Sequence, residues 1–212
     1  MTDSEMQALQ SFDLMVQNFK WKIPHEYNIA HDVCDKYAGS DKIAMYFEDE
    51  SGNEKVFTFK AFAEYSNSLA AYLRQMGIEK GDRIAVFLPQ GPEAAISHLA
   101  IFKLGAISVP FSTMFGPESV EHRLQDSEAK AIVTDQENKK KLNKVKANAD
   151  NLKYILIVGE KEGEEIDFES VISKKASSFT PEKTLGIDPA LIVYTSGTTG
   201  LPKGALHAHQ CI

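Results

Sequence analysis

Short apolar runs that alternate with helix-like segments constrain the fold of this chain more than any other feature. The run at 84–88 is continuous and has the length of a strand covered on both faces, and similar runs occur at 106–109, 131–134 and 154–158. Between these runs, apolar residues recur at helical spacing, and glycine or proline marks the boundaries. The alternation predicts an α/β fold, in which a largely parallel sheet is flanked by helices.

The residues before these strands predict a different local structure. Residues 43–47 and 55–58 have the composition of strands and are separated by turn residues at 51–53, which predicts a hairpin. Thr58 is expected to cap the next helix, and Gly77 to end it. We therefore expect three parts: an N-terminal extension that packs on the body (1–40), an α/β subdomain (41–180), and a strand with a phosphate-binding loop that opens the next, truncated subdomain (181–212).

Charge and composition argue against several classes of partner. The 212 residues carry a formal net charge of -7, whereas nucleic-acid binding requires an excess of basic side chains, so we expect no nucleic-acid partner. The lysine-rich stretch at 139–146 has apolar residues at helical spacing and predicts the solvated face of an amphipathic helix. The acidic N-terminus and the lack of a long apolar run predict a cytoplasmic protein without a membrane span, in which Cys34 and Cys211 are free thiols.

The stretch 191–204 combines a buried-type strand with a loop suited to phosphate. Residues 195–204 contain four hydroxyl side chains, three glycines and one lysine, and no acidic group. Glycines allow backbone N–H groups to approach an anion closely, hydroxyls can donate to phosphate oxygens, and Lys203 adds a positive charge. The candidate phosphate-binding residues are Thr195, Ser196, Gly197, Thr198, Thr199, Gly200 and Lys203. A flexible linker is the alternative, but a linker needs neither the preceding strand nor the Pro-Lys-Gly that follows.

The loop does not have the spacing of a standard P-loop ATPase, because Gly197 and Gly200 are too close and Lys203 does not follow a glycine. Instead, Tyr-Thr-Ser-Gly-Thr-Thr-Gly-Leu-Pro-Lys-Gly at 194–204 resembles the signature of the AMP-binding, adenylate-forming enzymes. Other stretches that are similar to motifs of this family lie at 57–59, 80–86, 102–110 and 122–135. Residues 114–117 and 21–24 are most similar to the acetyl- and medium-chain acyl-CoA synthetase branch.

The resemblance implies that the chain forms the first part of the large N-terminal domain of an adenylate-forming enzyme. Such enzymes activate a carboxylic acid with ATP and Mg²⁺, and the synthetases then transfer the acyl group to coenzyme A. It also implies that 195–203 wraps the departing phosphates and that Lys203 is catalytic, since it would stabilise the charge that develops on pyrophosphate. No metal ligand is assigned, and His207 and His209 are expected to pack or to border the pocket rather than to bind a metal.

The family's later motifs cannot be mapped, because the sequence ends at Ile212. We therefore expect an N-terminal piece of a ligase for short- or medium-chain acids that is inactive by itself, with 195–212 poorly ordered and its last strand in a sheet whose other strands are missing. Two alternatives stay open. One is an adenylate-forming ligase for an aryl acid or a carrier protein, and the other is a naturally short interaction module without catalysis. The sequence predicts no oligomeric state.

Overall fold

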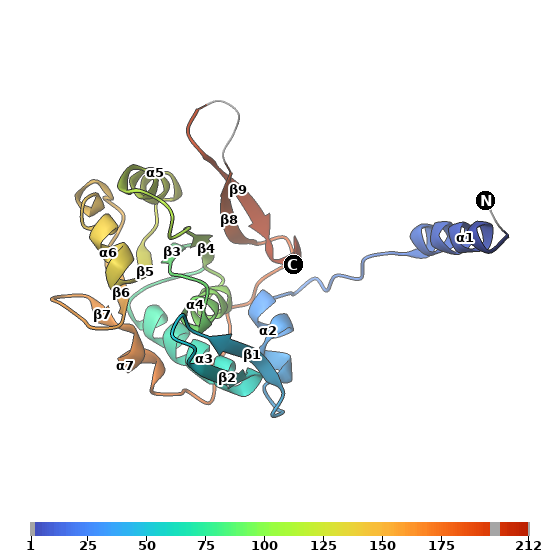
Figure 1. The fold of residues 1–212 in the computed structure, drawn as a ribbon, viewed down its shortest axis with the longest axis horizontal. Coiled ribbons are helices and arrows are strands. Elements are labelled where there is room, and N and C mark those ends of the chain that lie inside the picture. The colour runs from blue at the N-terminus through green and yellow to red at the C-terminus, as the bar shows by residue number, and fades with distance from the viewer. Residues whose placement is uncertain (1–2, 196–199, 212) are drawn as a thin grey trace.

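A seven-stranded sheet lies between two layers of helices in the computed structural model, which describes residues 3–195 and 200–211 (Figure 1). The strand order is β7-β6-β5-β3-β4-β8-β9, and neighbouring strands are parallel except for β8 and β9. The strands are β3 (Arg83–Phe87), β4 (Ile107–Pro110), β5 (Ala131–Asp135), β6 (Tyr154–Val158), β7 (Ile166–Asp167), β8 (Pro189–Thr195) and β9 (Lys203–Ala208). The predicted α/β fold is therefore confirmed.

Alternate side chains of the central strand β3 enter two separate cores. Ile84 and Val86 pack among residues of α3 (Phe59–Gln75), α4 (Pro92–Lys103) and α7 (Phe168–Ile172). Ala85 and Phe87 pack among residues of α5 (Pro117–Ser127) and α6 (Gln136–Leu142) on the other face. Both faces of the strand are buried, which is why its sequence is a continuous apolar run.

The chain reverses direction across the sheet at β3. It first passes through α4 to β4 on one side of β3, and then through α5 to β5 on the other side. Helix α4, which follows β3, and α6, which follows β5, cover opposite faces of the sheet. Open α/β sheets bind ligands in the crevice at the carboxyl ends of two such neighbouring strands. Because β8 runs parallel to β4, the last residue of β8, Thr195, lies at these same carboxyl ends.

The predicted hairpin is confirmed as a separate two-stranded sheet. It consists of β1 (Ile43–Glu48) and β2 (Glu54–Thr58), which pair antiparallel. The Thr58 hydroxyl accepts a hydrogen bond from the Ala61 N–H at 3.2 Å and so caps α3, as predicted. At the other end of α3, Gly77 has a φ of 81°, a conformation that favours glycine.

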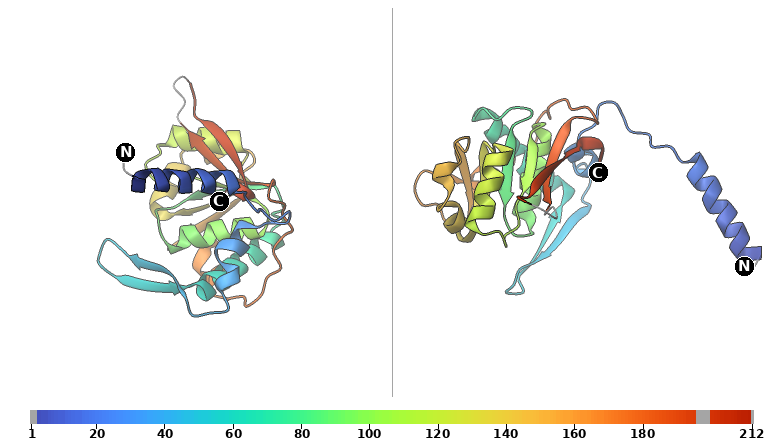
Figure 2. Two further views of the ribbon diagram at one scale, coloured as in Figure 1. Left: turned by 90° about the vertical axis from the view of Figure 1, so that its right-hand side faces the viewer. Right: turned by 90° about the horizontal axis from the view of Figure 1, so that it is seen from above.

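Only the later part of residues 1–40 contacts the body. Residues 25–27 are joined by backbone hydrogen bonds to 184–186, and α2 (Ile29–Val33) with the 3-10 helix Asp35–Tyr37 packs beside α3 and α4. Helix α1 (Asp3–Asn18) instead stands apart from the sheet in Figure 1 and in the right-hand view of Figure 2. The sequence predicts packing for the whole extension, whereas α1 has no partner surface in the described part of the chain.

The stretch 136–173 differs from expectation in two respects. The acidic segment 160–167, whose composition is typical of a surface loop, contributes the short strand β7 and leads into α7, whose Phe168 is fully buried. The lysine-rich stretch is not uniformly solvated, since Lys139 is only 5% exposed and its Nζ lies 2.6 Å from Glu165 Oε1. Helix α6 ends at Leu142 and the 3-10 helix Lys146–Asn148 follows after a turn, so the stretch is not one continuous helix, although its apolar residues Leu142 and Val145 are buried.

Among the described residues, each helix is too short or too polar to cross a lipid bilayer. The remaining 3-10 helix, His209–Cys211, follows β9.

Candidate functional site

The candidate phosphate loop joins two strands of the large sheet. Strand β8 lies beside β4, with Ser108 opposite Leu191, and β9 folds back antiparallel on β8. The last strand therefore belongs to the same sheet as β3–β7, whereas the sequence predicts that its neighbours are missing. Thr195 and Lys203 face each other in register at the end of this hairpin. Ser196, Gly197, Thr198 and Thr199 lie outside the described residues.

Two glycines at this hairpin occupy positions where a side chain would be strained or crowded. Gly200 has a φ of 98°, which is the left-handed region that residues with a Cβ rarely adopt. At Gly204, an added Cβ would lie 2.8 Å from Ile192 Cγ2 and 3.3 Å from the Tyr194 ring, so a larger residue would force these two side chains to move. The glycines predicted to shape the loop thus have a steric role in the part that the structure describes.

The Lys203 ammonium is available to an anion. The residue is exposed, and no carboxylate of the described chain lies within salt-bridge distance of it. Thr195, its partner across the hairpin, is exposed as well. The hairpin therefore presents a hydroxyl and an uncompensated positive charge side by side at the carboxyl ends of the parallel strands, an arrangement suited to phosphate.

Helix α5 contacts both flanks of the loop, which sequence reasoning about the loop alone does not reveal. The Tyr194 hydroxyl donates to Asp126 Oδ2 at 2.6 Å, and His122 Nε2 donates to the Pro202 carbonyl at 2.8 Å. Arg123 is buried, with its guanidinium carbon 3.9 Å from the centroid of the Phe115 ring. The stretch 122–135 signals family resemblance, but only the folded chain shows that α5 and the loop are in contact.

The two histidines after Lys203 have different environments. His207 lies in β9 and is partly buried, whereas His209 lies beyond the strand and is fully buried against Phe102. The Ile29 N–H donates to His209 Nδ1 at 3.3 Å, and burial lowers the pKa of His209 to about 4. Within the described residues, no group of three or more His, Cys, Asp or Glu side chains could hold a metal ion.

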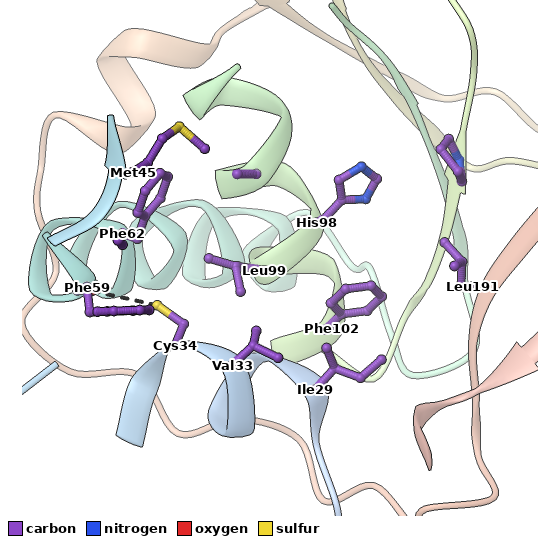
Figure 3. A pocket seen from close by; sticks show the side chains of 13 residues that line it. Ile29, Val33, Cys34, Met45, Phe59, Phe62, His98, Leu99, Phe102 and Leu191 are labelled. Carbon is purple, nitrogen blue, oxygen red and sulfur yellow. Dashed lines mark hydrogen bonds between the residues drawn. The ribbon is translucent and has the colours of Figure 1, made fainter. Parts of the chain in front are cut away.

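A second candidate site is an apolar cavity of about 490 Å³ on the α4 face of the sheet (Figure 3). Figure 3 shows Ile29 and Val33 of α2 and Leu99 and Phe102 of α4 around it, with Leu191 of β8 at its side. The Cys34 thiol at its wall donates to the Phe59 carbonyl at 3.6 Å, and burial, the main cause, raises the pKa of Cys34 to about 11. That thiol is therefore a weak nucleophile at neutral pH.

His98 is the one ionisable imidazole in the lining of this cavity. Its Nδ1 lies 2.7 Å from the hydroxyl oxygen of Ser108, and burial lowers its pKa to about 4. The imidazole is therefore neutral at physiological pH, so the cavity suits apolar groups and offers no positive charge to a phosphate. The hairpin, rather than the cavity, is the candidate for phosphate binding.

Comparison with known proteins gives a family match and several similar relatives. The family model described as AMP-binding enzyme matches residues 32–212. The acetyl-coenzyme A synthetase of Bacillus subtilis (strain 168) is 35% identical over 192 residues, which cover 87% of this chain and 33% of that protein. A crystal structure of Brucella canis acyl-CoA synthetase superposes with a TM-score of 0.84 at 28% identity, over 94% of this chain and 38% of that one.

A third similar protein is an anthranilate CoA ligase solved in complex with anthranoyl-AMP. It has a TM-score of 0.82 and 26% identity over 89% of this chain and 36% of that one. The chain spans about a third of the length of the relatives that it matches. The family model nevertheless covers most of the chain and includes the loop and the strands that carry it, so this chain belongs to the family of AMP-binding enzymes.

Proposed function

We propose that this chain contributes the phosphate-binding loop of an AMP-forming acyl-CoA synthetase. In the proposed reaction, a short- or medium-chain carboxylic acid reacts with ATP to form an acyl-adenylate, and the acyl group is then transferred to coenzyme A. The observation that carries the proposal is the β8–β9 hairpin, which presents Thr195 opposite a Lys203 without a carboxylate partner among the described residues, at the carboxyl ends of the parallel strands. The family assignment and the acetyl-coenzyme A synthetase relatives support it.

The chemistry assigned to the hairpin is charge stabilisation. When a carboxylate oxygen attacks the α-phosphorus of ATP, the bond to the β-phosphate oxygen breaks and pyrophosphate leaves with additional negative charge. A cation placed before the reaction where this charge develops lowers the barrier, and Lys203 is the residue to which we assign this role. We assign phosphate binding to Thr195, Ser196, Gly197, Thr198, Thr199 and Gly200.

Mg²⁺ and coenzyme A are the proposed metal cofactor and acyl acceptor of the reaction. Mg²⁺ would neutralise phosphate charge when it arrives with ATP, but the described residues provide no cluster of ligands for it. Coenzyme A is proposed as the acyl acceptor by similarity to the relatives, whose names state that they are CoA synthetases or ligases.

The acid substrate is assigned by similarity to the relatives. Acetyl-coenzyme A synthetases favour a short aliphatic acid, whereas the anthranilate CoA ligase acts on an aryl acid. An aryl-acid ligase of the same family is therefore the second candidate, because the structural match to that enzyme is nearly as good. Carboxylate-dependent exchange of pyrophosphate into ATP, measured on an enzyme that contains this chain with acetate through octanoate and with benzoate, distinguishes the two. We expect little or no exchange by the 212-residue chain alone.

The role of Lys203 is tested by phosphate binding to the chain. We expect isothermal titration to show binding of MgATP or pyrophosphate, and Lys203→Ala to weaken it at least about tenfold because a charge-assisted contact is lost. Lys140→Ala is the matched control, since Lys140 is an exposed lysine distant in sequence from the hairpin. Absence of binding by the unaltered chain, or equal binding by Lys203→Ala, would contradict the proposal.

A further inference from the structure

We propose that α5 positions the phosphate loop, with His122 and Asp126 as positioning residues that hold its two flanks. His122 acts on Pro202, which directly precedes Lys203, and Asp126 acts on Tyr194, which directly precedes Thr195. The inference rests on the proposed function, in which this loop binds the phosphates of ATP. It adds to that function two residues that do not belong to the loop.

The contact between His122 and Pro202 fixes the outgoing flank. A carbonyl oxygen can only accept, so the 2.8 Å contact requires a proton on Nε2 of His122. Proline has no N–H, so the carbonyl is the one polar backbone group that Pro202 offers to a side chain. The His122 ring also meets the Tyr194 ring edge-on, with centroids 6.2 Å apart. One side chain of α5 thus contacts both flanks of the loop, at Pro202 and at Tyr194.

The contact between Tyr194 and Asp126 fixes the incoming flank. The hydroxyl and the carboxylate oxygen are 2.6 Å apart, a distance typical of a charge-assisted hydrogen bond. Partial burial, followed by the bond to Asp126, raises the pKa of Tyr194, so the hydroxyl keeps its proton and remains a donor at physiological pH. Gly204, opposite Tyr194, makes room for the ring to lie in this position.

Arg123 stiffens the surface between these two contacts. Its guanidinium lies over the Phe115 ring and 5.3 Å from the centroid of the Tyr194 ring, and its Nη1 donates to the Ser119 carbonyl at 2.8 Å. A planar guanidinium between two rings favours a single arrangement of the three groups. The hairpin therefore rests on α5 through a packed surface with a hydrogen bond at each flank.

Fixed flanks matter for an anion site because ordering a flexible loop on binding costs conformational entropy. A glycine-rich loop that is ordered only when ATP arrives loses part of its binding free energy to ordering, whereas a loop with fixed flanks does not. Thr195 and Lys203 lie opposite each other, so a shift of either flank would separate the hydroxyl from the ammonium. We therefore expect the α5 contacts to strengthen phosphate binding without touching phosphate.

Substitutions can separate the hydrogen bond from mere packing. His122→Phe keeps a ring beside Tyr194 but removes the donor, whereas His122→Gln keeps an N–H donor at a similar reach and removes the ring. Tyr194→Phe removes only the hydroxyl. His31→Gln on α2 is the control, because His31 is exposed and lies on another element. Rescue by glutamine is the result that a purely packing role would not produce.

Hydrogen exchange of the 212-residue chain tests the contacts without any ligand. We expect the β9 amides to exchange about five- to tenfold faster in His122→Phe and Tyr194→Phe, the effect of losing one hydrogen bond, while β3–β6 amides are unchanged. His122→Gln and His31→Gln should match the unaltered chain. Unchanged β9 exchange in His122→Phe, or equally fast exchange in His122→Gln, would overturn the proposal.

MgATP titration of the same variants then separates this inference from the function on which it rests. We expect the affinity of His122→Phe to fall about fivefold and that of His122→Gln to recover. Equal affinity of His122→Phe and the unaltered chain would overturn the positioning role. If the unaltered chain binds no MgATP, the proposed function fails, while hydrogen exchange still decides whether α5 holds the flanks of the loop.

Discussion

Lys103 shows how a single buried charge ties the N-terminal segment to the body. Its side chain is fully buried, and Nζ donates to Asn67 Oδ1 at 2.6 Å and lies 2.8 Å from Asp35 Oδ1 without the geometry of a hydrogen bond. Burial lowers the pKa of Lys103, and the Asp35 charge opposes this shift. The pair therefore joins the 3-10 helix after α2 to α3 and α4. Removing these charges from water costs free energy, which their mutual attraction offsets.

We predict that Lys103→Met destabilises the chain by about 3 kcal/mol, because Asp35 is then left without its cation. Urea unfolding followed by circular dichroism gives the free energy of unfolding. The double variant Lys103→Met with Asp35→Asn should lose less than the sum of the two single losses, since no uncompensated charge remains. Strictly additive losses would show that the two side chains do not interact.

At the scale of elements, the hairpin β1–β2, the Thr58 cap and the strands β3–β6 could be predicted from local patterns, since turn residues, caps and apolar runs are contiguous in sequence. Strand β7 and α7 could not, because a two-residue strand has no periodicity and the acidic residues around it masked the buried Phe168. Pairing of Lys139 with Glu165 and of His122 with Pro202 depends on the order of elements across the sheet. Local sequence carries no signal for that order.

Helix α1 is an element without tertiary support in the described chain. Its side chains Phe12 and Met15, and Phe19 just beyond it, are 57%, 62% and 58% exposed. An isolated helix of this length has marginal stability in water, so its folding contributes little to that of the body.

Deletion of residues 1–18 should therefore shift the thermal midpoint by less than about 2 °C. Differential scanning calorimetry of the full and shortened chains measures this shift. A matched deletion within α7, which buries Phe168, should instead prevent cooperative unfolding. A loss of more than about 5 °C on removing α1 would mean that the helix packs on the body in solution.

At the scale of the whole molecule, two buried neutral histidines make stability depend on pH. Burial holds the pKa values of His98 and His209 near 4 in the folded chain, against 6.5 for an ordinary histidine. Between these pH values the unfolded chain binds more protons, so the free energy of unfolding falls as pH is lowered from 6.5 to 4. Each histidine contributes up to about 3 kcal/mol of this loss, which is complete below both pKa values.

Urea unfolding between pH 7 and pH 4 should show this decline. His209→Phe should remove the part of this pH dependence of the free energy of unfolding that His209 causes. His31→Gln, at an exposed position, should leave the pH dependence unchanged. Asp188 and Glu165 have pKa values lowered mainly by hydrogen bonds to Lys80 and Lys139, so their contribution is lost only at lower pH. A flat profile from pH 7 to pH 5 would contradict the burial of the neutral imidazoles.

The position of β9 at the end of the strand order has a consequence for association between molecules. In the described chain, the backbone N–H and C=O groups on its outer side face no further strand, and Leu206 is 58% exposed. An open strand of this kind is a template on which another extended segment can add by main-chain hydrogen bonding. The same strand begins at Lys203, so any segment that extends the sheet here would also form a wall beside the phosphate loop.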